Sequence, residues 1–98
     1  MSRSHFSSAQ KYDTDFEIDQ LAFRISRLAC HRAFDRSEVV SPQLKKYLPH
    51  HRPADRAMQL SEARERLVKA RLDGKLIDYL AYNVQIELDL ANSRLAAA

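Results

Sequence analysis

Two pairs of neighbouring residues carry the side chains most often used for metal binding and nucleophilic catalysis. Cys30 directly precedes His31, and His50 directly precedes His51. Thiolate and imidazole are common zinc ligands, but adjacent residues on a helix point about 100° apart. No two histidines lie four residues apart, so no helix would present two imidazoles on one face. We therefore predict no metal site, and we expect Cys30 to be a small buried apolar residue.

The other polar residues give little support for catalysis. One glycine in 98 residues is too few for a glycine-rich phosphate loop. The four acids between 13 and 19 lie where a helix is expected to begin, and there they complement the helix dipole. We predict that the protein is not an enzyme and that it binds no cofactor.

A basic region occupies the middle of the chain. Residues 24–56 hold eight Lys or Arg against three acids, within a net charge of +3. Such cations could neutralise phosphates in a salt-dependent manner, although the connector at 49–53 lacks the glycine typical of a helix-turn-helix. A dimeric nucleic-acid-binding or transcription-regulating protein is therefore the alternative function. The residues that would bind nucleic acid are Arg24, Arg27, Lys45, Lys46 and Arg52.

Composition indicates that helices position all of these residues. Val and Ile total eight residues and Thr one, whereas Ala, Leu, Arg, Lys, Glu, Gln and Met account for 53 of the 98. Helix formers thus dominate and strand formers are scarce. A single cysteine excludes an intrachain disulfide. A chain of this length forms one small domain with a modest core.

The first half of the chain predicts one long and one short helix. Thr14 and Glu17 have the spacing of a capping box, which indicates a helix over about 15–35 after a flexible polar arm over 1–13. The segment 41–49 opens with Ser-Pro, which suits the N-cap and the first helical position, and it closes with Pro. This segment therefore predicts a short second helix.

The second half predicts a middling helix over about 54–72 and a long one over about 75–96. Gly74 between them can adopt the left-handed conformation that ends a helix. Because the turn is short, the two helices should run antiparallel and form a helical hairpin. The predicted fold is thus all-α, a small bundle of about four helices in a single domain over 14–98.

One segment allows a different interpretation. Residues 83–90 alternate between polar and apolar types, which is a strand pattern, and Asp73-Gly74 would suit a hairpin turn. A helix with two apolar faces produces the same alternation. Gln, Glu and Leu are helix formers, so their presence in the segment favours the helix.

Helical wheels place apolar residues on two sides of both long helices. In the first helix, a stripe that includes Ile18, Ile25 and Leu28 is opposed by aromatic residues, and in the last helix a stripe from Ile77 to Leu95 is opposed by a second apolar group. A helix that is apolar on two sides must be covered on both. Either the short helix and the N-terminal arm cover the second faces, or another protein chain does.

We expect the second faces to bind protein, so that the chain is a small helical subunit, regulator or inhibitor of a larger partner. Aromatic and arginine side chains supply most of the binding energy in interfaces, and a self-complementary face would give a homodimer. A polar N-terminus and the lack of any long apolar run predict a cytoplasmic protein without membrane attachment. The residues expected to bind the partner are Phe16, Phe23, Arg24, Arg27, Phe34, Tyr79, Tyr82, Ile86 and Leu90.

Overall fold

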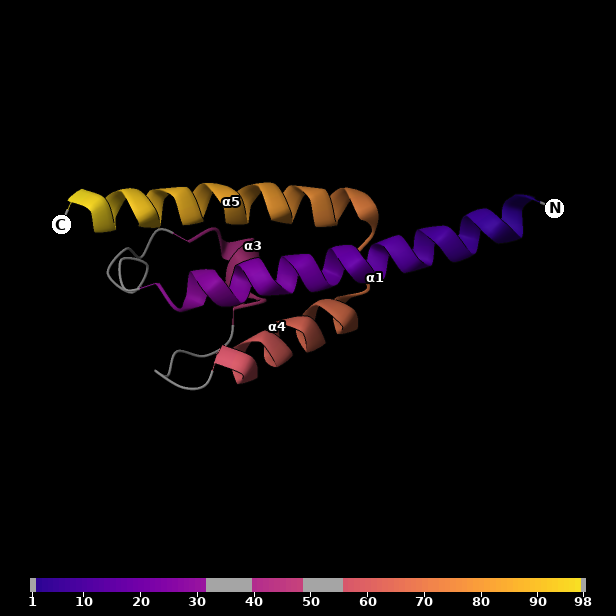
Figure 1. Ribbon diagram of the computed structural model, residues 1–98, viewed down its shortest axis with the longest axis horizontal. Helices are drawn as coiled ribbons and strands as arrows, with labels where there is room; N and C mark the ends of the chain where they lie inside the picture. Colours follow the sequence, from indigo (N-terminus) through magenta and orange to yellow (C-terminus); the bar gives the residue numbers. More distant parts are fainter. Residues whose placement is uncertain (1, 32–39, 49–55, 98) are drawn as a thin grey trace.

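The structure is a computed structural model that describes residues 2–31, 40–48 and 56–97. Over these residues the chain forms helices and no strand, which confirms the predicted all-α bundle. The helices are α1 (Ser2–Ala29), α3 (Pro42–Lys45), α4 (Arg56–Ala70) and α5 (Gly74–Ala97) (Figure 1). None of the described helices combines the length and the apolar character needed to cross a membrane.

Helix α1 lies in the centre of the bundle. In Figure 1 it runs between α4 and α5, and it packs against both, while α3 packs against α5. Helices α4 and α5 are antiparallel and joined by a short turn, as the predicted hairpin requires. Within the described residues, the two arms of this hairpin contact α1 rather than each other.

The core is built from one stripe of each helix. Leu21, Ile25 and Leu28 of α1 are fully buried, together with Leu67 of α4 and Leu80 of α5. Each of these side chains contributes about 2 kcal/mol through the removal of its apolar surface from water. Buried residues recur every three or four positions along each of the three longer helices, so each of these helices presents one continuous stripe to its neighbours.

Helix α1 differs from its predicted bounds at both ends. It begins at Ser2 rather than near Thr14. Residues 2–13 contain neither Gly nor Pro, so no residue interrupts the helix ahead of Thr14. The segment expected to be an arm is therefore helical, and it extends past the other helices in Figure 1. At the other end α1 stops at Ala29, where the amide of His31 donates to the carbonyl of Leu28 and tightens the last turn.

The turn between α4 and α5 uses different residues from those predicted. Arg71, not Gly74, has a left-handed backbone, with φ of 49°, and Gly74 is already the first residue of α5. Asp73 caps α5, since its carboxylate Oδ1 accepts a hydrogen bond from the Leu76 amide at 2.9 Å. Arg71 thus takes the left-handed position expected of the glycine, and Asp73 caps the start of the next helix.

The alternating segment and the Ser-Pro segment both contribute to helices. Residues 83–90 lie within α5, so the helical interpretation of their alternation is confirmed. Helix α3 begins at Pro42 after Ser41, as predicted, although the Ser41 side chain forms no capping hydrogen bond. The fully buried Leu44 anchors this short helix in the core.

Candidate protein-binding surfaces

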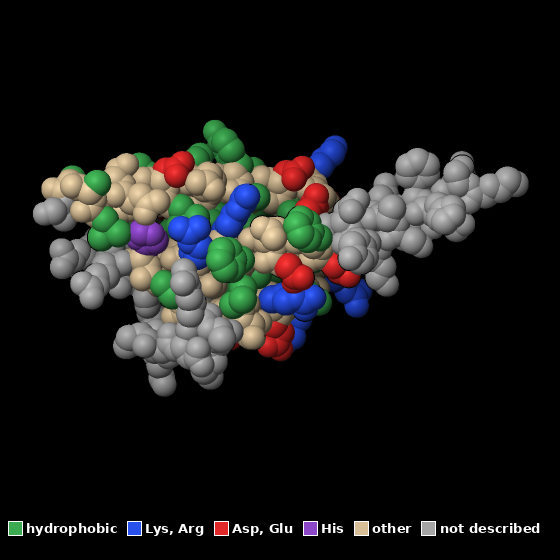
Figure 2. Space-filling model, in the orientation of Figure 1, with side chains coloured by type: hydrophobic (Ala, Val, Ile, Leu, Met, Phe, Trp, Pro, Cys, Tyr) green, Lys and Arg blue, Asp and Glu red, His purple; other side chains and the backbone are tan. Residues whose placement is uncertain are grey.

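The first candidate surface is the outer side of α1, which we call the aromatic face and which comprises Phe16 and Phe23. Their side chains are 61% and 46% exposed, although the buried stripe of the same helix is almost completely covered. Arg24 is half-buried beside Phe23, and Arg27 is exposed one turn further on. Figure 2 shows hydrophobic and basic side chains next to each other along the middle of the molecule, where α1 runs. Phe34, predicted to share this face, lies outside the described residues.

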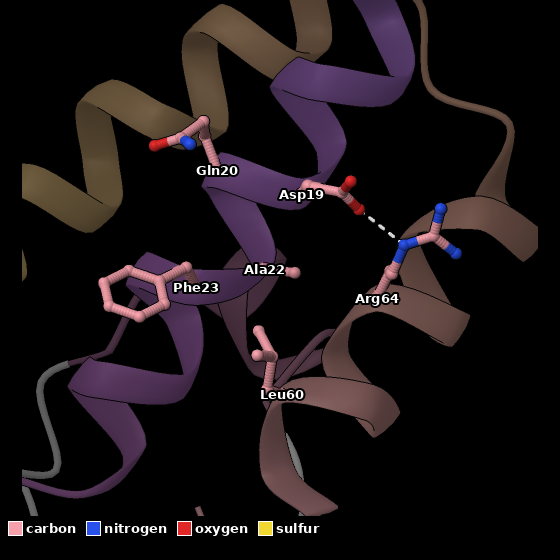
Figure 3. A pocket seen from close by; sticks show the side chains of 6 residues that line it. All are labelled: Asp19, Gln20, Ala22, Phe23, Leu60 and Arg64. Carbon is pink, nitrogen blue, oxygen red and sulfur yellow. Dashed lines mark hydrogen bonds and ion pairs between the residues drawn. The ribbon is translucent and has the colours of Figure 1, made fainter. Parts of the chain in front are cut away.

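A groove of about 350 Å³ separates the aromatic face from α4. Its lining residues are Asp19, Gln20, Ala22, Phe23, Leu60 and Arg64. In Figure 3, Ala22 and Leu60 lie between the Phe23 ring and an ion pair. The pair joins Arg64 to Asp19: Nε of Arg64 donates a hydrogen bond of 2.5 Å to Oδ1 of Asp19. Both charged side chains are about half exposed, so the pair fixes α4 against α1 only weakly. The groove therefore extends the aromatic face with apolar surface, and a charged pair borders it.

The second candidate surface is the outer side of α5, which we call the α5 face. Its predicted members are all exposed, from Ile86 at 39% to Tyr82 at 68%, with Tyr79 and Leu90 between these values. On the other side of α5, the buried residues are Ile77, Leu80, Val84, Leu88 and Ala91. The helical wheel thus separates covered from uncovered positions correctly over most of this helix.

Three exposed apolar residues were not predicted as surface residues. Leu76, at 37%, precedes Tyr79 by three positions and continues the α5 face, a spacing that could have identified it. Leu95 is exposed although the wheel places it in the core stripe, because α5 extends past the end of α1 in Figure 1. Val68 on α4 is also exposed, and it belongs to neither face.

Cys30 and His31 do not form the environment that we expected. The thiol of Cys30 is exposed rather than buried, and it donates a hydrogen bond of 2.7 Å to Oε1 of Gln59 on α4. His31 is half-buried, and its Nδ1 atom is buried without a hydrogen-bond partner among the described residues. In the part of the chain that the structure describes, no three His, Cys, Asp or Glu residues gather closely enough to hold a metal ion. His50 and His51 lie outside that part.

The candidate nucleic-acid residues come from two helices. Arg24 and Arg27 belong to α1. Lys45 is the last residue of α3 and Lys46 follows it, and both lysines are exposed. Helix α3 packs against α5. Arg52 lies outside the described residues.

One carboxylate near the α5 face has an altered affinity for protons. Glu87 is half-buried, and this burial raises the pKa of its carboxyl group above the ordinary value of 4.5, because desolvation penalises the charged form. Arg94, further along α5, partly opposes the shift by favouring the carboxylate. The edge of the α5 face therefore carries a carboxylate that is less completely hydrated than a free glutamate.

Both surfaces are built from the same kind of helix, apolar on an inner and on an outer side. What they offer chemically is apolar area with charges along its borders. Neither the protein families, nor the curated proteins, nor the solved structures with which the chain was compared give a match.

Proposed function

We propose that the protein is a small helical binding module that attaches to another protein chain through its aromatic face and its α5 face. The observation that carries this proposal is the exposure of large apolar side chains at regular helical spacing on both long helices. Scattered apolar residues are normal on a protein surface, whereas contiguous apolar patches on a small domain typically mark interfaces.

The alternative explanation of these faces is that other parts of the same chain cover them. Helix α3 directs its anchor, Leu44, into the core. Residues 2–13 continue α1 as a helix and do not fold back as an arm. Tyr82 nevertheless remains 68% exposed and Phe16 61% exposed, which supports the binding of a separate chain.

The side chains suit the roles we assign to them. Phe23, Tyr79 and Tyr82 have few rotatable bonds and large surfaces, so they can act as anchors with little loss of conformational entropy. Arg24 and Arg27 beside the aromatic face would attract and orient an acidic partner surface. Each phenylalanine or tyrosine that becomes fully covered would contribute about 2 kcal/mol before the entropic cost of association.

The experiment compares four forms of the chain as bait, namely the wild type, Phe23→Glu, Tyr82→Glu and Val68→Glu. Any protein captured by the wild type is purified, and its affinity for each form is measured by calorimetry. We expect Phe23→Glu or Tyr82→Glu to weaken binding at least tenfold, because a desolvated charge would replace an apolar anchor. Val68→Glu is the matched control, since Val68 is exposed on α4 outside both faces.

Circular dichroism of the variants distinguishes a lost interface from a lost fold. Exposed positions tolerate a charge, so helicity should match the wild type. If Phe23→Glu and Tyr82→Glu both unfold, the two faces belong to the core and the proposal fails. If the chain is instead retained on heparin well above low salt, and Arg27→Ala with Lys45→Ala abolishes that retention, nucleic-acid binding replaces it.

A further inference from the structure

Four exposed apolar residues of α5 and the half-buried Asn83 form a regularly spaced row, which we call the seam. Leu76, Tyr79, Asn83, Ile86 and Leu90 are spaced by three, four, three and four residues. This is the a and d spacing of a heptad repeat, by which one helix presents a continuous stripe to another helix. The seam lies about 120° around α5 from the buried stripe, which places it on the solvent side of the helix.

We propose that this seam packs against the same seam of a second copy of the chain, so that the protein forms a homodimer through two parallel α5 helices. The inference rests on the proposed function and names the partner of the α5 face. In Figure 1, α5 forms one edge of the bundle, and Figure 2 shows hydrophobic side chains projecting from that edge. A second copy can therefore approach α5 from the side opposite α1.

The orientation follows from Asn83, which occupies the central a position. A parallel dimer sets each a residue against its own counterpart, so the two Asn83 amides would face each other. The Asn83 side chain donates one hydrogen bond of 2.8 Å to the Tyr79 carbonyl. Its second amide hydrogen and its amide oxygen are then available to the other copy. An antiparallel arrangement would set this amide against an apolar side chain instead.

One pair of charges that borders the seam fits the same orientation. In a parallel pair, each g residue faces the e residue five positions later on the other helix. Asp89 occupies g and Arg94 occupies e, so opposite charges meet twice across the two-fold axis. Gln85 donates a hydrogen bond of 3.0 Å to Oδ1 of Asp89, which leaves the other carboxylate oxygen for the arginine of the second copy.

The apolar area predicts how strong this dimer is. Large side chains present about 150–250 Å² each, so the exposed parts of the apolar seam residues and Tyr82 come to roughly 500 Å² per copy. Two copies would bury about 1,000 Å², which is near the lower limit for a specific interface. We therefore expect a weak, reversible dimer with a dissociation constant on the order of micromolar. The aromatic face suits self-association less well, because Arg24 and Arg27 would meet their own like charges.

Sedimentation equilibrium of the full chain over a range of concentrations tests the proposal. The mass should rise from 11.3 kDa towards twice that value as the concentration increases. Ile86→Glu should raise the dissociation constant about tenfold or more at unchanged helicity, whereas Val68→Glu on α4 should leave it unchanged. If Ile86→Glu loses helicity, Tyr79→Ala, which is at a more exposed position, takes its place.

Cross-linking tests the orientation. Ser93 is three residues after Leu90, at the d position that would continue the seam. Ser93→Cys in a Cys30→Ser background should therefore form a disulfide-linked dimer under mild oxidation. A chain that remains a monomer at several hundred micromolar, or a dimer unaffected by Ile86→Glu, overturns the proposal. A dimer that fails to cross-link overturns the parallel arrangement. A monomer whose other protein partner is lost in Tyr82→Glu overturns the dimer but leaves the proposed function intact.

Discussion

Val84 and Ile86 provide a direct test of the two-sided helix, because they lie two positions apart on α5 in opposite environments. Val84 is completely buried, and Ile86 is 39% exposed. Val84→Ala removes two buried methyl groups and leaves a cavity, which should lower the free energy of unfolding by about 2 kcal/mol. For a chain of about this size, that corresponds to a decrease in Tm of roughly 10 °C.

Ile86→Ala should change the free energy of unfolding by only about 0.5 kcal/mol. At this exposed position the smaller side chain buries slightly less apolar surface, and the higher helix propensity of alanine partly offsets that decrease. Urea and thermal denaturation followed by circular dichroism would measure both variants. Dilute protein is needed, because dimerisation would make Tm depend on concentration. Equal destabilisation by the two substitutions would refute the distinction between a covered and an uncovered side of α5.

Three further predictions concern polar groups. Asp73→Ala removes the cap of α5 and should lower the free energy of unfolding by about 1 kcal/mol, whereas Asp73→Asn keeps an acceptor and should retain most of it, as chemical denaturation can measure. Glu87 has a raised pKa in the folded chain, so the folded state holds its proton more tightly and loses stability as the pH rises above 4.5. Glu87→Gln should therefore stabilise the chain at neutral pH and show no such advantage well below pH 4.5; an advantage that persists in acid would exclude this cause. A double-mutant cycle on Asp19 and Arg64 should give a coupling energy of about 0.2–1 kcal/mol that falls with added salt, and a coupling independent of salt would contradict an exposed ion pair.

Much of the fold can be predicted from the sequence because the apolar residues follow the helical period. Periodicity places Ile18, Leu21 and Ile25 on one stripe of α1, and all three are buried. The same periodicity places Phe23 and Tyr82 on the opposite sides of their helices, and both are exposed. A wheel requires only the local geometry of one helix, and that geometry is the same in every α-helix.

The errors arise where local signals compete. The capping box at Thr14 does not begin a helix, since the residues before it also adopt helical geometry. Gly74 was expected at the left-handed position, yet Arg71 occupies it and Asp73 caps the next helix. Several residue types can begin, end or cap a helix, so the local sequence alone does not determine which residue does so.

The sequence by itself determined that this chain is helical and that both long helices carry apolar residues on two sides. Only the tertiary structure decided whether the second side is also covered. With α1 between α4 and α5, each outer helix has α1 as its main neighbour among the described residues. The far side of α5 is therefore left uncovered, from Leu76 to Leu90. The physical reason is that periodicity fixes where apolar residues lie around one helix, whereas burial depends on how many helices the chain can place around it.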